Sequence, residues 1–408
     1  MKLTLALTFL LTLPLAAEDW PQFLGPRRDG TYAGKNLAAQ WPADGPQVLW
    51  RKPVGTGWGG ATAEGGKVVL FYRNGDKEVV ECCDAKSGRT VWKHQYDTDY
   101  RDQFGKDNGP RATPAIAGGR VYTMGAGGIV SALDFKTGEA LWRVHTQKEY
   151  RADLGFFGMA CSPLVHGKSV LLNVGGGNGA GIIALNTASG ELRWKSSADN
   201  TSYSSPMLAQ LDGKSRALFF TRAGLEAVEP ATGKSLFKFA WRPAINASVN
   251  AATPLVSENL VFISTSYGKG AALLAVKGNR TETIWARDGV MSNQYATCVL
   301  KDGHLYGFHG RADVGGCELR CVELKTGRVK WTHPGLRAGT VTLAGGTLLI
   351  LTERGELLRA PANPTAFRPT ARAQILGFNV RAYPALANGL FLARDERNFV
   401  CVDLRKAE

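Results

Sequence analysis

The residues Asp134-Phe135-Lys136-Thr137-Gly138-Glu139-Ala140-Leu141-Trp142 are one copy of a motif that recurs along the whole chain. In such a motif the acidic or amide side chain accepts hydrogen bonds from backbone N–H groups that follow it. The glycine supplies the positive φ that closes a hairpin. Each copy follows a short apolar run that ends in a small residue, at Ala132, Ala184, Ala227, Ala275 and, as cysteine, at 82, 321 and 401. Each copy therefore predicts a strand, a tight turn and an outer strand anchored by an aromatic residue.

The aromatic anchors recur at a regular period. They are Trp50, Trp92, Trp142, Trp194, Phe237, Trp285, Trp331 and Phe367, with spacings from 36 to 52 residues. Repetition at this length in strands is typical of a β-propeller with four strands in each blade. A step of small residues opens the expected innermost strand of every unit: Ala61-Thr62, Thr113-Pro114, Ser162-Pro163, Ser205-Pro206, Thr253-Pro254, Thr297-Cys298, Thr340-Val341 and Tyr383-Pro384. Eight anchors and eight steps predict eight blades.

The two ends of the pattern complement each other. Val400-Cys401-Val402-Asp403 has the features of a third strand whose anchor strand is missing, and Val48-Leu49-Trp50 is an anchor without a preceding hairpin. We predict that the N-terminal strand completes the last blade, which removes exposed sheet edges. The expected fold is an all-β, eight-bladed propeller of four-stranded antiparallel blades. It forms a single domain over residues 18–408, with a lead-in segment at 18–47.

The first residues have the features of an export signal. Met1-Lys2 precedes an apolar run from Leu3 to Leu15 and then Ala16-Ala17, so we expect residues 1–17 to be a signal peptide. The run is shorter than the roughly 20 residues that span a bilayer. No cysteine precedes Cys82, so a lipid-attachment cysteine is not expected. These features predict a soluble periplasmic or secreted protein, peripheral to the membrane at most and monomeric.

The charge of the chain limits its partners. The formal net charge is +14, yet the lysines and arginines are scattered along the sequence. Nucleic acid is therefore not expected, and anionic envelope surfaces or acidic proteins suit the charge better. Simple solubility is the alternative explanation. Of the seven cysteines, those at 82, 321 and 401 occupy the small-residue slot of the repeat and are expected to be core thiols.

The motif from Ala132 to Trp142 resembles the repeat of the pyrroloquinoline-quinone (PQQ) propeller superfamily, over nearly the whole of the chain after residue 17. The opening Asp19 to Gly30 is similar to the N-terminal signature of exported, PQQ-binding-like repeat proteins. Two branches of that superfamily are relevant. The quinoprotein alcohol dehydrogenases hold PQQ and Ca²⁺ at the mouth of an eight-bladed ring. The BamB type is a non-catalytic scaffold of the outer-membrane β-barrel assembly machinery, and its resemblance implies an envelope protein as partner.

The residues do not favour the enzyme branch. Those dehydrogenases carry a disulfide between adjacent cysteines, but Cys82 and Cys83 lie within an expected strand and would point to opposite faces of the sheet. Calcium requires converging oxygen ligands. Two residues before the steps stand Gly60, Arg111, Ala160, Tyr203, Ala251, Tyr295, Ala338 and Arg381, with no carboxylate among them. We therefore predict no catalytic residue, no metal site and no cofactor.

Several alternatives remain open from the sequence. Acids at Asp102, Asp107, Asp199 and Asp288 lie in loops that could reach the same face, so PQQ and Ca²⁺ remain the alternative cofactors of a quinoprotein dehydrogenase. A glycan-processing enzyme would need two carboxylates about 5 to 10 Å apart. The leading expectation is an exported, non-catalytic binding or scaffold propeller of the cell envelope.

The positions before the steps alternate between small and large residues around the expected ring. Equivalent positions of a closed ring face one axis, so the large side chains either fill the channel or line a pocket. Arginine forks and tyrosines suit an anion or an anionic glycan. The candidate ligand-binding residues are Arg111, Tyr203, Asn250, Tyr295, Arg337 and Arg381.

Overall fold

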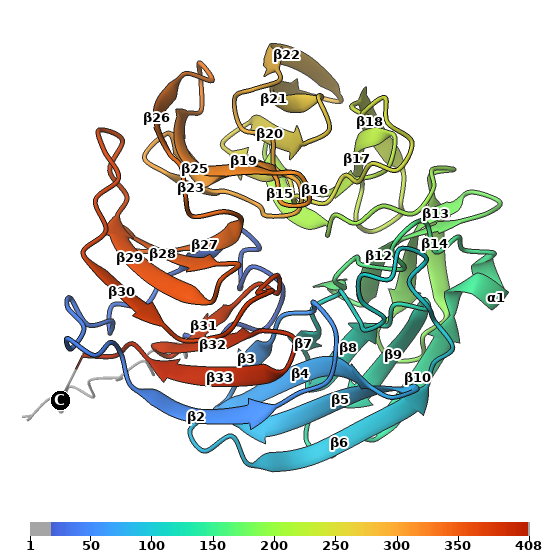
Figure 1. The fold of residues 1–408 in the computed structure, drawn as a ribbon. Helices are drawn as coiled ribbons and strands as arrows, with labels where there is room; N and C mark the ends of the chain where they lie inside the picture. The colour runs from blue at the N-terminus through green and yellow to red at the C-terminus, as the bar shows by residue number, and fades with distance from the viewer. Residues whose placement is uncertain (1–17, 407–408) are drawn as a thin grey trace, which may run out of the picture.

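The computed structural model describes residues 18–406, and the predicted signal peptide at 1–17 lies outside them. Eight small antiparallel sheets stand around one axis and form an eight-bladed propeller, as predicted (Figure 1). Blade 1 comprises β3 (Thr62–Glu64), β4 (Lys67–Asn74), β5 (Lys77–Asp84) and β6 (Thr90–Asp97). Blade 2 comprises β7 (Ala115–Ala117), β8 (Arg120–Met124), β9 (Ile129–Asp134) and β10 (Ala140–His145). Blade 3 comprises β11 (Leu164–His166), β12 (Ser169–Gly176), β13 (Ala180–Asn186) and β14 (Leu192–Ser196).

The next three blades repeat this order from the innermost to the outermost strand. Blade 4 comprises β15 (Met207–Leu211), β16 (Lys214–Phe220), β17 (Gly224–Val228) and β18 (Ser235–Ala240). Blade 5 comprises β19 (Leu255–Ser257), β20 (Leu260–Thr265), β21 (Gly270–Lys277) and β22 (Arg280–Arg287). Blade 6 comprises β23 (Val299–Lys301), β24 (His304–Arg311), β25 (Gly315–Glu323) and β26 (Val329–His333). Blade 7 comprises β27 (Gly339–Ala344), β28 (Thr347–Thr352), β29 (Glu356–Pro361) and β30 (Ala371–Gln374). The helix α1 (Thr146–Tyr150) lies between blades 2 and 3, and none of the helices in residues 18–406 could cross a membrane.

The last blade combines the last three strands of the chain with an early one. Its strands β31 (Ala385–Ala387), β32 (Leu390–Arg394) and β33 (Asn398–Asp403) are followed in the sheet by β2 (Val48–Pro53). Trp50 stands opposite Cys401, the register that the repeat predicts (Figure 1). The closure prediction is confirmed.

The anchor tryptophans lock neighbouring blades together. Trp142 stands opposite Ala132 within its own blade, and its indole N–H donates to the carbonyl of Thr187 in the hairpin of the next blade. The hairpin glycine lies against the preceding anchor, since a Cβ built on Gly138 would come within 2.5 Å of the Trp92 ring. An indole hydrogen bond of this kind connects neighbouring blades at six of the eight junctions. The donors are Trp50, Trp92, Trp142, Trp194, Trp285 and Trp331.

The two weakest copies of the motif fold differently from the prediction. Trp285 stands opposite Leu273, not Ala275, because a two-residue turn at Gly278-Asn279 replaces the longer hairpin of the other blades. The predicted anchor Phe367 precedes β30 and packs its ring on Trp331 instead, with centroids 5.7 Å apart.

The small-residue steps join neighbouring blades near the axis. The hydroxyl of Thr113 accepts from the backbone N–H of Gly60, and the hydroxyl of Ser162 accepts from that of Thr113, both at 3.0 Å. Ser205 repeats the contact with Ser162, and Thr297 repeats it with Thr253. A hydroxyl at this position therefore satisfies a buried N–H of the preceding blade, which explains why the step favours serine and threonine.

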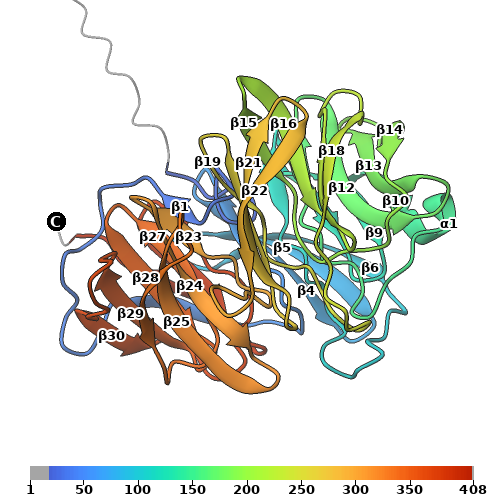
Figure 2. The same ribbon diagram turned by 90° about the horizontal axis from the view of Figure 1, so that it is seen from above.

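The lead-in segment crosses one end of the axial channel, the end at which the inner strands finish. Trp20 is 2% exposed and bridges Ala63 of blade 1, while β1 (Thr31–Tyr32) lies parallel to the end of β27 in blade 7 (Figure 2). The Arg28 guanidinium is 1% exposed and donates to the carbonyl oxygens of Ser162 and Pro163. The channel is thus covered at this end, here called the lead-in face. The opposite end, where loops join successive blades, is called the loop face.

All seven cysteines are buried and free. Cys82 and Cys83 are adjacent in β5 but belong to different core clusters on the two sides of the sheet. Burial raises the pKa of the Cys82 thiol to about 12 and that of Cys83 to about 11, so both stay protonated at neutral pH.

Candidate functional site

At the loop face, side chains from several blades gather around Trp58 in a group here called the mouth. The guanidinium carbons of Arg111 and Arg381 lie 4.9 and 5.0 Å from the centroid of its ring. Arg381 also lies 5.8 Å from the centroid of the Tyr295 ring. These side chains come from loops that enter four different blades, numbers 1, 2, 6 and 8. The structure therefore brings three of the six predicted residues together around a tryptophan.

Arg111 is held firmly by its own loop. Its guanidinium donates to the Asp102 carboxylate at 3.0 Å and to the carbonyl oxygens of Asp107 and Gly109. Asp102 in turn accepts from the backbone N–H groups of residues 104, 106 and 107. The charge of Arg111 is thus already paired, and its first role is to fix the loop at 98–111.

Arg381 has no such partner. Within residues 18–406 it makes no hydrogen bond and no ion pair, and its contacts are the faces of Trp58 and Tyr295. Several polar atoms close by are buried without a hydrogen-bond partner: the indole N–H of Trp58, the Nε of Arg111 and the hydroxyl groups of Tyr100 and Tyr295. Buried groups of this kind are ordinarily satisfied by protein, water or ligand. The mouth therefore offers donors to an incoming acceptor, and one oxygen of the nearby Glu353 carboxylate is also buried without a partner.

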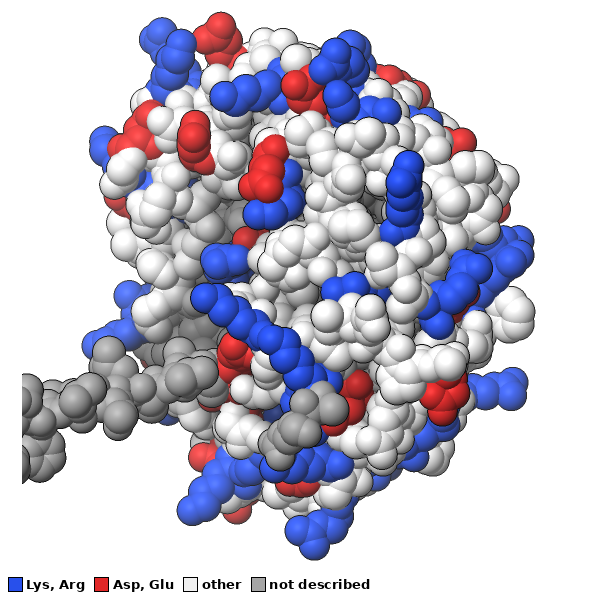
Figure 3. All heavy atoms as spheres, turned by 90° about the vertical axis from the view of Figure 1, so that its left-hand side faces the viewer, with Lys and Arg blue, Asp and Glu red and all other residues white. Residues whose placement is uncertain are grey.

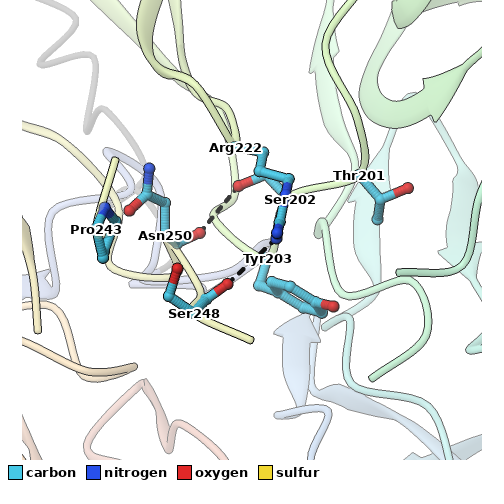
Figure 4. A pocket seen from close by; sticks show the side chains of 7 residues that line it. All are labelled: Thr201, Ser202, Tyr203, Arg222, Pro243, Ser248 and Asn250. Atoms are coloured by element: carbon cyan, nitrogen blue, oxygen red, sulfur yellow. Dashed lines mark hydrogen bonds between the residues drawn. The ribbon is translucent and has the colours of Figure 1, made fainter. Parts of the chain in front are cut away.

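Two other predicted residues lie in a neighbouring crevice. The Tyr203 hydroxyl accepts from the backbone N–H groups of Phe156 and Phe157, at 2.7 and 3.1 Å. The Asn250 amide is buried and donates to the carbonyl oxygens of Thr221 and Trp241. Figure 4 shows the crevice, in which the Tyr203 ring points away from the Asn250 side chain. Both side chains are engaged in holding loops.

The sixth predicted residue, Arg337, lies outside this group. It is exposed, adopts a left-handed φ of +57° and makes no hydrogen bond or ion pair inside the described range.

Sequence reasoning missed Trp58, although a signal for it exists. Trp58 stands among glycines at 55, 57, 59 and 60. A Cβ on Gly59 would meet the Ala112 carbonyl at 2.6 Å, so the glycines let this loop lie directly against the next blade. A tryptophan in a segment that admits only glycine around it indicates a fixed, close-packed site.

A second feature of the loop face is an aromatic shelf, formed by Phe104, Phe156 and Phe157. Phe104 is 49% exposed, and its ring centroid lies 6.2 Å from that of Phe156 and 5.1 Å from that of Phe157. Phe157 packs edge-on against Tyr203, and the Arg222 guanidinium lies 5.2 Å from the Phe156 centroid. The shelf joins the loops of blades 1 to 4 into one surface.

The four loop acids considered for a calcium site are engaged by other groups of the chain. Asp102 is committed to Arg111, Asp107 accepts from the backbone of Gly57 and Gly109, Asp199 from that of Ala223, and Asp288 from the Ser292 hydroxyl. Nowhere between residues 18 and 406 do three or more His, Cys, Asp or Glu side chains gather in a way that could hold a metal ion. The residues present therefore do not fit the calcium set that PQQ accompanies.

Curated relatives include both branches of the superfamily. The chain is 25% identical over 258 residues to outer membrane protein assembly factor BamB of Shewanella oneidensis, which covers 60% of this chain and 62% of that protein. It is 34% identical over 99 residues to BamB of Xanthomonas campestris pv. campestris, 24% of each chain. It is 29% identical over 129 residues to quinohemoprotein alcohol dehydrogenase ADH-IIG of Pseudomonas putida, 31% of this chain and 18% of that protein. Each match spans less than two thirds of the relative's length.

Solved structures share the fold. BamB from Moraxella catarrhalis superposes with a TM-score of 0.64 at 14% identity, over 89% of this chain and 98% of that one. Quinohemoprotein alcohol dehydrogenase from Comamonas testosteroni superposes with a TM-score of 0.66 at 14% identity, over 96% of this chain and 81% of that one. At this identity the likeness concerns the fold alone.

The sequence profile of a protein family discriminates further. The profile described as "Outer membrane protein assembly factor BamB" matches residues 34–195 and 76–333, which together make up more than half of the chain. The chain therefore belongs to this family, as a BamB-like β-propeller of PQQ-type repeats.

Proposed function

We propose that this chain is a non-catalytic scaffold of the bacterial envelope that supports outer membrane protein assembly by binding another protein at its loop face. The observation that supports this most directly is the unpartnered Arg381 on the Trp58 ring, beside the exposed aromatic shelf. Arginine and aromatic residues are enriched in the energetic centres of protein interfaces. The relatives' printed name, assembly factor, agrees with such a role.

The chemistry of the mouth suits an acidic side chain of the partner. A carboxylate approaching Arg381 gains a charge-assisted, bidentate contact, for which the planar guanidinium is already oriented by Trp58 and Tyr295. Arg111 adds little attraction because Asp102 neutralises it. The apolar area of the contact comes from Phe104 and Phe157, which lie on the same face.

The experiment is site-specific photo-crosslinking in cells. A crosslinker at Phe104 is expected to capture a component of the outer membrane assembly machinery, and Arg381→Gln is expected to reduce that capture several-fold. The matched control is a crosslinker at Val91, which is 48% exposed on an outer strand and should not capture it. Equal capture from both positions, or capture unaffected by Arg381→Gln, contradicts the proposal.

A PQQ-dependent dehydrogenase is the rival function, because one curated relative is a quinohemoprotein alcohol dehydrogenase. The carboxylates that calcium needs are committed elsewhere at this mouth. We expect the purified chain, supplied with PQQ and Ca²⁺, to oxidise no alcohol or aldehyde. Turnover above that of a quinone-free sample would replace the scaffold proposal with the enzyme.

A further inference from the structure

A groove lies at the lead-in face, between the lead-in segment and blade 7. Its volume is about 220 Å³, and its walls come from residues 34–41, the β27–β29 strands and Leu404. Backbone bonds hold the walls in place, from Ala38 N–H to the Leu404 carbonyl at 2.8 Å and from Lys406 N–H to the Asn36 carbonyl at 2.9 Å. The groove is therefore formed before any ligand arrives.

Part of the groove lining is apolar. Ala344, Leu349 and Leu404 are buried members of the same core cluster, and Leu37 and Trp41 are partly buried against it. An engineered cavity of about 150 Å³ holds benzene, whereas drug-sized ligands need about 300 to 1,000 Å³. The space suits a short acyl chain.

Two cations, Lys35 and Arg359, stand among these apolar walls. Lys35 makes no hydrogen bond or ion pair within the described residues, and the Arg359 guanidinium contacts only the Thr370 hydroxyl, at 3.0 Å. The acids nearby are engaged, because Glu356 pairs with Arg372 and the Glu18 carboxylate accepts from the Tyr32 hydroxyl. Figure 3 faces this side of the molecule, where Lys and Arg are more prominent than Asp and Glu. Neither of the two cations is therefore paired with a carboxylate among the described residues.

We propose that this groove binds a single-chain amphiphile with an anionic head, such as a fatty acid. The acyl chain lies against Leu349, Leu404 and Trp41, and the carboxylate lies between Lys35 and Arg359. Burial of apolar area supplies the affinity, and the two cations select the charged head. This site is separate from the loop face and independent of the scaffold function.

Titration calorimetry with octanoate tests the proposal. We expect saturable binding that is at least tenfold weaker in the Lys35→Gln/Arg359→Gln double variant. The matched control is Lys325→Gln/Arg354→Gln, which removes two exposed cations that form no ion pair with any described residue and should leave binding unchanged. Octanol, which lacks the charge, and butyrate, which lacks the chain, should each bind at least tenfold more weakly than octanoate.

A second readout locates the ligand. Octanoate should change the tryptophan fluorescence of the folded chain, and Trp41→Phe should abolish that change while calorimetric binding persists. The proposal is overturned if octanoate does not bind at millimolar concentration, if octanol binds equally well, or if both double variants behave alike. Capture of a protein by a crosslinker at Ala38, without any binding of octanoate, would make the groove a protein interface instead.

Discussion

The glycine of each repeat meets two separate demands at the residue scale. Gly138 has a φ of +78°, which non-glycine residues rarely adopt, and it lies directly beneath the Trp92 ring of the preceding blade. Any side chain at this position would therefore strain the turn and displace the anchor. The repeat requires its glycine for packing between blades as much as for the hairpin.

Gly138→Ala should destabilise the protein more than Gly118→Ala does. Gly118 also has a positive φ, +57°, but nothing lies within 4 Å of its would-be Cβ. Left-handed strain costs about 1–2 kcal/mol in both variants. Overpacking adds about 1–3 kcal/mol at Gly138 alone. Urea unfolding followed by circular dichroism measures the free energy of unfolding of both variants. An equal decrease in the two variants would show that the contact of Gly138 with Trp92 does not affect stability.

His309 should make stability depend on pH. Its Nδ1 accepts from the Ser292 backbone N–H at 2.9 Å, so the folded ring is neutral. Burial, aided by the charge of Arg320 and opposed by Glu318 and Asp288, lowers its pKa to about 4. The unfolded chain takes up this proton near pH 6.5. Stability should therefore fall as the pH drops from about 6.5 to about 4, and should not change further below that range through this residue.

The size of this effect is on the order of 1–2 kcal/mol, after allowance for partial exposure of the ring to solvent. His309→Gln should flatten the dependence over that pH range. His304→Gln is the control, because its ring forms a hydrogen bond with the Asp302 carbonyl and with no other group of residues 18–406. An NMR titration that finds His309 protonated near pH 6.5 would contradict the argument.

At the scale of elements, β2 carries the closure of the ring. It supplies the outer strand of blade 8, and its anchor Trp50 donates to the Ala85 carbonyl of blade 1. Without β2, strand β33 would present an open edge and the last junction would lose its indole bond. One strand of six residues therefore holds two blades in place.

Deleting residues 18–53 should abolish cooperative unfolding. Deleting only 18–32 keeps β2 but removes the segment that crosses the axis, and should give a folded ring with a lower Tm. Calorimetry of the two variants beside the full chain separates closure from the axial contacts of Trp20 and Arg28. A 18–53 deletion that melts like the full chain would refute the role of β2.

At the scale of the whole molecule, the local repeat was enough to predict the ring, its eight blades and its closure. Each hairpin is set by a few neighbouring residues, so intact copies such as Ala132 to Trp142 were placed in the correct register. The copies at Trp285 and Phe367 were misplaced because their turns follow different local chemistry. Equivalent register also predicted that Arg111, Tyr203, Tyr295 and Arg381 share one mouth. The structure brings Arg111, Tyr295 and Arg381 together, whereas Tyr203 lies in the neighbouring crevice.

The features that the sequence did not predict depend on contacts between distant segments of the chain. The lead-in segment reaches blades 1, 3 and 7 through residues such as Trp20, Arg28 and Tyr32, and no local period encodes that path. The Asn250 amide is directed by the carbonyl oxygens of Thr221 and Trp241, whereas Arg337 has a left-handed backbone. The direction of a side chain follows from its local bonding, which the register alone does not specify.

The pairing of β2 with β33 has a consequence for the timing of folding. The strand β2 cannot find its sheet until residues 398–403 exist, so every other strand of the ring must be synthesised before the final seam forms. Closing so long a loop is entropically costly, and topologies with such distant contacts fold slowly. During that interval the nascent chain exposes an unsealed blade, a temporary acceptor for any extended segment that arrives before β2. Protection of this seam by a chaperone would then matter most in the interval before β33 has been synthesised.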